Sequence, residues 1–158
     1  MPTMGETLNK RLRLTRLAGA TQDAVLNLLV ASGVLRDKID SVFGAEGLTG
    51  PQYNVLRILR GAQPGGFARC EIAQRLVERA PDVTRLIDRL ERQGLVARDR
   101  SSEDRRRSVT RITDKGLQLI DRMEPAMNAL DRWLEERLSL RDRNELSRIL
   151  ELLYSNED

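Results

Sequence analysis

A short amphipathic helix, bounded by a proline and a glycine and followed at once by an arginine-rich segment, most constrains how this chain can fold. Its apolar residues recur at helical spacing and form one stripe: Val83, Leu86, Ile87 and Leu90. Pro81 suits the first helical turn, where its missing N–H is no loss, and Gly94 suits the position just past the helix end. The pattern predicts a helix over residues 81–93 with one buried and one polar face.

A second short amphipathic helix is predicted just before this one. Its apolar stripe consists of Ile72, Ala73, Leu76 and Val77. Two short amphipathic helices joined by a tight turn are typical of a helix-turn-helix, whose second helix reads a DNA major groove. Residues 69–93 therefore predict a helix-turn-helix.

Two segments with the composition of β-strands follow, at 95–98 and 108–113. Residues 99–107 lie between them and read DRSSEDRRR, which is polar and turn-forming. A hairpin with an arginine-rich tip is expected here. Because a helix-turn-helix with such a hairpin is a winged helix-turn-helix, we expect a mainly α fold with a small β-hairpin wing.

Several spaced motifs resemble the MarR family of bacterial transcription regulators. They are LTGPQY at 48–53, VTRLIDRLE at 83–91, GLV at 94–96, DRR at 104–106, Val109 and ITDKG at 112–116. The resemblance covers residues 48–120 at motif level, and the flanking helices in layout only. It implies a sequence-specific regulator, expected to be a repressor, that binds double-stranded DNA.

Apolar stripes also predict four helices outside the wing and the helix pair: 21–44, 49–62, a long helix from Thr113 to Leu138, and 140–155. Thr49 and Thr113 are predicted N-caps, and Pro125 is predicted to bend or interrupt the long helix. Phe67 is expected in a short strand that pairs with the wing. Residues 1–20 are predicted to form either a basic arm or a helical extension.

The chain departs from the family pattern where the first helix of the pair begins. Many relatives have serine or threonine as N-cap there, whereas residues 67–71 of this chain read FARCE. Glu71 still favours a helix N-terminus through the helix dipole. The start of this helix is left open by the sequence.

The helices on either side of the winged helix have more apolar surface than it alone can cover, which indicates an interface. A symmetric homodimer covers such surface and places two recognition helices on successive major-groove faces of a pseudo-palindromic operator. The resemblance implies the same arrangement. We expect dimerisation helices in 1–44 and 114–158, and the DNA-binding domain in 45–113.

The charge is distributed in agreement with this division. Residues 69–113 have 12 basic and 8 acidic side chains, a net charge of +4, whereas residues 114–158 have 7 basic and 11 acidic ones, a net charge of −4. A basic region within a chain whose other end is acidic suits a protein that places one face on a polyanion.

By resemblance, the polar face of helix 81–93 enters the major groove. Thr84 and Arg85 are the expected contacts to base edges, because arginine to guanine O6 and N7 is the commonest specific contact. Arg89 is expected to contact phosphate or to pair with Asp88 or a neighbouring acid. Asp88 is counted in the same DNA-binding face.

In the wing, Arg106 is expected in the narrow, electronegative minor groove. Asp104 is expected to hold that side chain extended, with Arg105 and Arg107 near phosphates. The alternative is an ordinary charged turn.

Composition argues against several other classes. Without histidine, Ser-His and Cys-His catalysis and histidine-rich metal sites are excluded, and no enzyme, metal or cofactor is predicted. No run of about 18 apolar residues predicts a membrane span, and no signal peptide is recognised. The single cysteine agrees with a reducing cytoplasm.

Two other functions stay open: a redox-switched regulator that uses Cys70, and a winged-helix scaffold that binds protein instead of DNA. In the family, phenolic or other aromatic acids often bind between the dimer helices and the DNA-binding lobe. A small aromatic or phenolic ligand that releases the DNA is therefore part of the expectation, with its existence left open.

Overall fold

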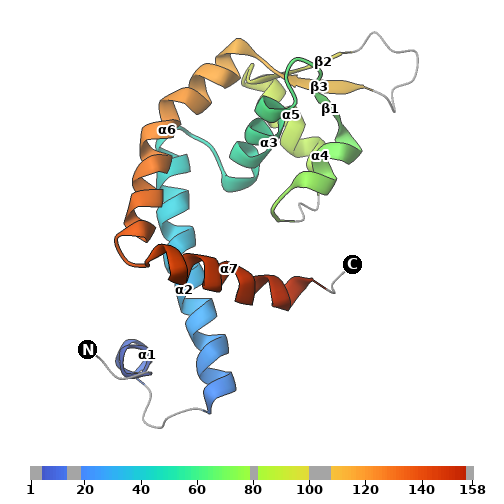
Figure 1. The fold of residues 1–158 in the computed structure, drawn as a ribbon. Helices are drawn as coiled ribbons and strands as arrows, with labels where there is room; N and C mark the ends of the chain where they lie inside the picture. The colour runs from blue at the N-terminus through green and yellow to red at the C-terminus, as the bar shows by residue number, and fades with distance from the viewer. Residues whose placement is uncertain (1–4, 14–18, 79–81, 100–107, 156–158) are drawn as a thin grey trace. The chain divides into compact units, whose positions relative to one another are not determined.

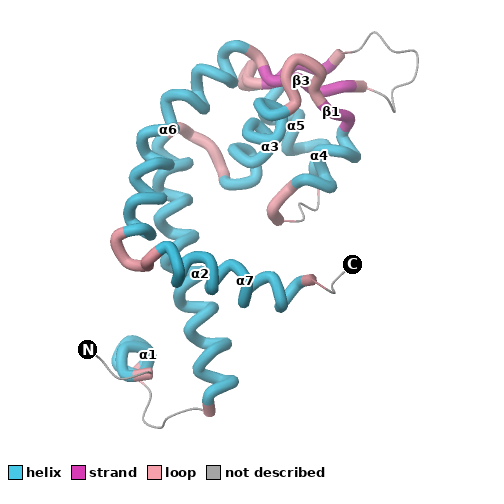
Figure 2. Tube along the Cα trace, in the orientation of Figure 1, coloured by secondary structure: helices cyan, strands magenta, loops and turns pink. Residues whose placement is uncertain are grey.

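The computed structural model describes residues 5–13, 19–78, 82–99 and 108–155. This part of the chain is mainly helical with one three-stranded sheet, which confirms the predicted fold class (Figures 1 and 2). In chain order the elements are α1 (Glu6–Leu12), α2 (Ala20–Ala45), α3 (Gly50–Gly61), β1 (Phe67–Ala68), α4 (Arg69–Arg75), α5 (Val83–Arg92), β2 (Val96–Arg98), β3 (Val109–Ile112), α6 (Asp114–Glu135) and α7 (Leu140–Tyr154). They divide into two compact units, Met1–Ser41 and Val42–Asp158.

The first unit contains α1 and most of α2. Part of the segment 1–20 is thus helical. α1 ends at Leu12, and the C-cap residue Arg13 has a left-handed backbone with φ 52°. Leu8 of α1 is buried. α2 confirms the helix predicted at 21–44, but its Val25 and Leu29 are 53% and 62% exposed. A long helix with an exposed apolar face has surface available for a partner.

α3 is the centre of the second unit and packs against α4, α5, β3 and α6 (Figure 1). Its most deeply buried residues are Val55, Leu56 and Leu59. Thr49 is the N-cap of α3, as predicted, and its backbone N–H donates to Gln52 Oε1 at 2.8 Å. One helix, α3, therefore holds α4, α5, β3 and α6 together.

The sheet is antiparallel with strand order β1-β3-β2. Phe67 of β1 pairs with Thr110 of β3, which confirms the short strand predicted at Phe67. Gly66, with φ +75°, leads into β1, and a Cβ there would lie 2.3 Å from the carbonyl oxygen of Thr110. This close approach of two backbones requires glycine.

α4 begins at Arg69 without a serine or threonine cap. Instead, Glu71 Oε2 accepts a hydrogen bond from the backbone N–H of Ala68 at 2.8 Å. A glutamate at the third helical position satisfies one of the N–H groups that every helix start leaves open. The acid expected to favour this helix start therefore does so by a direct hydrogen bond.

The prediction that Leu76 and Val77 continue the stripe of α4 is wrong. The helix ends at Arg75, the backbone of Leu76 is extended, and Val77 is 78% exposed. Ile72 is the one fully buried residue of the predicted stripe, so burial favours a further turn only weakly.

Thr113 caps α6, as predicted. Its Oγ1 accepts a hydrogen bond from Gly116 N–H at 3.1 Å and donates one to the carbonyl oxygen of Gly94 at 2.7 Å. The end of the wing and the end of α5 are thereby joined at the first turn of α6.

Pro125 does not interrupt α6, which is continuous from Asp114 to Glu135. A proline inside a helix costs about 3 kcal/mol, and burial of the preceding part of α6 offsets this cost. The buried residues there are Gly116, Leu119, Ile120 and Met123. The predicted continuation of the stripe to Leu138 is wrong, because α6 ends at Glu135. A separate helix follows, as predicted: Ser139 caps α7 by accepting a hydrogen bond from Asp142 N–H at 3.2 Å.

α7 has no buried residue. Its exposed apolar side chains are Leu140, Leu146, Ile149, Leu152, Leu153 and Tyr154. In the described part of the chain, no helix combines the length and the apolar character that crossing a membrane requires.

Candidate nucleic-acid interface

α5 is fixed in the second unit by its apolar face and by both of its ends. Ile87 and Leu90 are buried, and the helix packs against α3, α4 and β2. At its start, Asp82 Oδ1 accepts a hydrogen bond from the backbone N–H of Arg85 at 2.9 Å. At its end, Gly94 adopts a left-handed backbone with φ +72°. The opposite face of α5 is consequently presented outward in one orientation.

Pro81, predicted in the first turn of this helix, lies outside the described residues. The helix begins at Val83 with Asp82 as its N-cap, two residues later than predicted.

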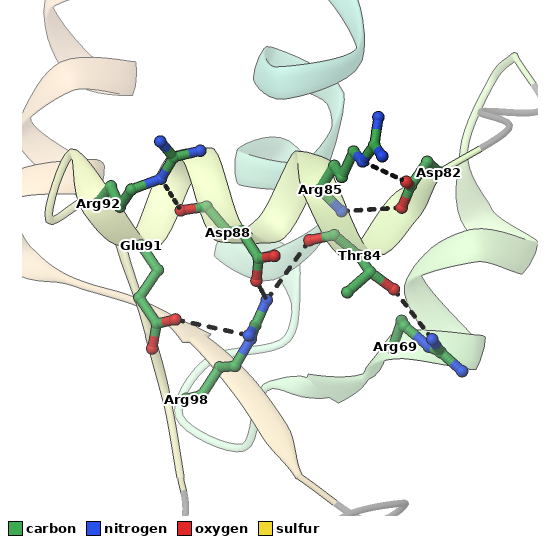
Figure 3. A network of polar contacts seen from close by, with 8 residues as sticks. All are labelled: Arg69, Asp82, Thr84, Arg85, Asp88, Glu91, Arg92 and Arg98. Atoms are coloured by element: carbon green, nitrogen blue, oxygen red, sulfur yellow. Dashed lines mark hydrogen bonds and ion pairs between the residues drawn. The ribbon is translucent and has the colours of Figure 1, made fainter.

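Thr84 and Arg85, the two predicted base-edge contacts, lie near the start of α5 and have different environments (Figure 3). The Thr84 hydroxyl accepts a hydrogen bond from Arg69 Nη1 at 2.9 Å. The Arg85 side chain is 81% exposed, and its Nε pairs with Asp82 Oδ2 at 3.0 Å. Arg69 thus joins α4 to α5, whereas Arg85 extends into solvent while one of its nitrogens is held.

Asp88, the third predicted residue, is joined to the wing. Its Oδ1 pairs with Nη2 of Arg98 on β2, and the same guanidinium lies 3.6 Å from Oε2 of Glu91 (Figure 3). Arg98 Nη2 also donates to the carbonyl oxygen of Thr84 at 3.5 Å. The Arg98 side chain is 23% exposed. One arginine of the wing therefore binds three acceptors along α5.

Arg89, the fourth, is exposed and forms no ion pair with residues 5–13, 19–78, 82–99 or 108–155. The expected alternative, a pair between Arg89 and Asp88, is not found there, because the Asp88 carboxylate binds Arg98. Arg92 lies on the same helix and donates from Nε to the backbone carbonyl of Asp88 at 3.3 Å. Arg85 and Arg89 are thus cationic groups that α5 presents outward.

The sequence did not single out Arg69 or Arg98 as partners of the α5 polar face. For Arg98 a signal exists, because strand side chains alternate between faces and Arg98 lies two residues after Val96. Val96 is buried and Ala97 exposed, so Arg98 shares the face of the strand that is directed at the core. For Arg69, fifteen residues before Thr84, no comparable sequence signal exists.

The base of the wing is closed by hydrogen bonds between its two strands. Asp99 N–H donates to the carbonyl oxygen of Val109 at 2.9 Å, and Ser108 Oγ donates to that of Asp99 at 3.1 Å. The predicted wing residues Asp104, Arg105, Arg106 and Arg107 lie outside the described residues. Cys70 is a free, exposed thiol at the second residue of α4.

Comparison with known proteins agrees with this geometry. The family model named MarR family matches residues 48–108. The HTH-type transcriptional repressor Rv2887 of Mycobacterium tuberculosis is 30% identical over 140 residues, which span 87% of this chain and 99% of the repressor. The chain belongs to the MarR family of DNA-binding transcription regulators.

Solved structures of MarR proteins share the fold. A MarR transcription factor from Planctomyces limnophilus is 37% identical with a TM-score of 0.67, and the match covers 87% of this chain and 99% of that one. The MepR–DNA complex from S. aureus, at 22% identity, has a TM-score of 0.72 with 89% and 98% covered, which is a likeness of fold. Some other relatives match over less of their length, since the chain spans 66% and 57% of two curated regulators. The predicted family and the winged helix-turn-helix are confirmed.

Proposed function

We propose that this MarR-family chain is a homodimeric repressor that binds a pseudo-palindromic operator in double-stranded DNA. The observation that carries the proposal is the presentation of α5. Its apolar side is buried, both of its ends are fixed, and Arg85 and Arg89 extend from the opposite side. A helix held in this way fits the major groove, where side chains near its N-terminus reach base edges.

Within the major groove, Thr84 and Arg85 contact base edges and Arg89 contacts phosphate. A guanidinium can fork onto guanine O6 and N7, and it can equally bind phosphate oxygens. Asp88 contributes by fixing the wing through Arg98, which supports a positioning role in the interface for this acid.

The wing enters the minor groove in this proposal. Arg106 is the inserted side chain, Asp104 holds it extended, and Arg105 and Arg107 lie near phosphates. The support is the position of these residues between β2 and β3, together with the attraction of a narrow minor groove for arginine.

The remaining helices form the dimer contact in this proposal. Segments 1–44 and 114–158 form the contact between two copies, and 45–113 binds DNA. The exposed apolar side chains of α2 and α7 support this assignment, because contiguous exposed apolar surface marks an interface. A twofold dimer places its two copies of α5 about 34–36 Å apart, one turn of DNA.

Release of the operator by a small aromatic or phenolic ligand completes the proposal, and the family resemblance supports it. Such a ligand must distinguish a DNA-binding state from another state of the dimer. Benzoate and 2-hydroxybenzoate serve as probes. Their addition is expected to weaken the DNA complex. Unchanged DNA affinity with both probes would contradict release by such a ligand and would leave the rest of the proposal standing.

A mobility shift with duplex DNA from upstream of the chain's own coding sequence tests DNA binding. We expect a sequence-preferring complex whose affinity falls steeply with salt, because phosphate contacts release counterions. Arg85→Ala should lose the preference, and Arg106→Ala should weaken the complex. If both variants are folded dimers with unaltered DNA affinity, a protein-binding scaffold replaces the proposal.

A redox-switched regulator is the second candidate, and the exposed thiol of Cys70 favours it. Cys70 follows Arg69, whose guanidinium binds Thr84 of α5, so oxidation there would disturb the junction of the two helices. Release of DNA by peroxide from the wild-type protein and not from Cys70→Ser would support it. Equal behaviour of the two proteins would eliminate it.

A further inference from the structure

Asp82 uses its two carboxylate oxygens for two different purposes. Oδ1 accepts the backbone N–H of Arg85 at 2.9 Å and thereby caps α5. Oδ2 pairs with the side-chain Nε of the same arginine at 3.0 Å (Figure 3). Arg85, whose side chain is 81% exposed, is thus held through its Nε by the residue that caps the helix.

The other two acids of this region have a different partner. Asp88 and Glu91 both bind Arg98 of β2, whose side chain is only 23% exposed. Those two carboxylates therefore fix the wing strand to α5. The Asp82 carboxylate, in contrast, pairs with Arg85 on the outward face.

We infer that Asp82 is a positioning residue for base recognition, which holds Arg85 so that its terminal nitrogens read a guanine. This inference rests on the proposed function and names the determinant of its specificity. A guanidinium has five N–H donors. Because the Nε donor is bound to Asp82, the Nη groups are directed away from it, and a fork of such donors matches guanine O6 and N7.

Holding the side chain also lowers the entropic cost of recognition. A free arginine side chain loses rotamer freedom when it is ordered on a base, and this loss opposes binding. Arg85 at 81% exposure has few packing contacts to order it, so the Asp82 carboxylate is the group that restricts it before DNA arrives.

Capping alone does not account for a charged residue at this position. Asparagine caps a helix about as well as aspartate. A carboxylate at the surface that meets DNA repels phosphate whatever the sequence. Replacement of Asp82 by asparagine therefore separates the two purposes: the cap stays, the repulsion disappears, and the charged partner of Arg85 is lost.

The experiment compares wild type, Asp82→Asn and Arg85→Ala as full chains. Each protein selects duplexes from a double-stranded DNA library with a randomised centre. Affinities are then measured at one salt concentration for the duplex that wild type selects, for versions with each G·C pair changed to A·T, and for random duplex.

For Asp82→Asn we expect an unchanged helical circular dichroism spectrum and random-duplex binding at least as tight as that of wild type. Its preference for one G·C pair per half-site should fall about fivefold to tenfold, because a bidentate arginine contact contributes discrimination of this order or more. Asp82→Ser retains a capping side chain and should behave in the same way, which gives a second variant.

If Asp82 only caps the helix, Asp82→Asn raises the affinity for selected and random duplexes equally, and the unchanged ratio overturns the inference. Glu145→Gln is the matched control, because Glu145 pairs with Arg148 at i,i+3 on α7 in the same exposed manner. It should leave the guanine preference intact. Wild-type protein without any sequence preference would overturn the proposed function itself. An intact guanine preference in Arg85→Ala would overturn the inference together with the assignment of Arg85 to a base edge, and it would leave the proposed DNA-binding repressor standing.

Discussion

Replacement of Arg98 by alanine is the sharpest test of how the wing is held to the recognition helix. The substitution removes a guanidinium that binds the carboxylates of Asp88 and Glu91 and the backbone carbonyl of Thr84. The two acids are three residues apart on α5, so after the substitution they are neighbouring like charges without their shared cation.

The magnitude follows from the exposure of the three side chains, which is 23% for Arg98, 43% for Asp88 and 26% for Glu91. Exposed ion pairs contribute about 0.2–1 kcal/mol, whereas removing one partner of a buried pair costs about 3–5 kcal/mol. A half-buried arginine with two acidic partners lies between, at about 1–3 kcal/mol. For a domain of this size, that loss lowers the Tm by about 2–12 °C.

DNA affinity should fall together with stability. When β2 is no longer tied to α5, the wing must be ordered during binding, and that entropy opposes the complex. Each 1.4 kcal/mol of lost binding free energy raises the Kd of the complex about tenfold. Arg98→Lys keeps the charge but not the fork that spans two carboxylates, so its effect should be intermediate.

Thermal unfolding and DNA titration of Arg98→Ala, Asp88→Asn and the double variant form a double-mutant cycle. Residues in direct contact show a coupling energy of about 0.5–3 kcal/mol. A coupling energy indistinguishable from zero, or an Arg98→Ala protein with wild-type Tm and DNA affinity, would refute the docking of the wing through this side chain.

Three further predictions concern packing, ionisation and assembly. Gly116→Ala places a Cβ 2.3 Å from the carbonyl oxygen of Leu95, so it should lower the free energy of unfolding, measured in urea, by about 1–3 kcal/mol. A Cβ at the control position Gly61 meets no atom within 4 Å, so Gly61→Ala should not lower it. Equal losses in the two variants would contradict this prediction. Burial raises the pKa of Tyr53 above its ordinary 10.0, against the opposing effect of nearby arginines. Because the folded pKa exceeds the unfolded one, the associated stability is present below pH 10.0 and is lost as the pH rises through the folded pKa; alkaline destabilisation should be steeper in wild type than in Tyr53→Phe, and identical pH profiles would contradict it. Leu152 is 63% exposed on α7, the helix assigned to the proposed dimer contact. Leu152→Glu should therefore halve the molecular mass measured by sedimentation while the helical circular dichroism signal is retained. An unchanged molecular mass would exclude α7 from the contact.

Local signals explain why much of the fold could be predicted from the sequence. The stripe of α5, the capping threonines at 49 and 113, and the alternation of helix and strand composition each act within a few residues. Capping and amphipathic periodicity stabilise an element wherever one face can be buried. These features were enough to predict α5, the second helix of the helix-turn-helix, and the order of the elements.

The errors fall where tertiary contacts decide. Whether α4 continues through Leu76 depends on what lies beneath it, and only Ile72 is buried there. Instead, the guanidinium of Arg75 lies over the Phe67 ring at 4.2 Å, where the helix ends. α6 continues through Pro125 because its first half is buried against α3 and, at Gly116, against Leu95 and Ile112. The periodicity of apolar residues alone predicts neither the end of α4 at Arg75 nor the continuation of α6 through Pro125.

The candidate site was predicted as one polar face, whereas its acids have two different kinds of partner. Carboxylates on a surface that meets DNA repel phosphate regardless of sequence, so their presence beside α5 needs a geometric reason. Asp88 and Glu91 have one in Arg98, which fixes the wing, and Asp82 has one in Arg85, which we infer reads a guanine. The two arrangements predict different losses: variants of the first should lower stability and affinity together, and variants of the second should lower only the ratio of specific to random binding.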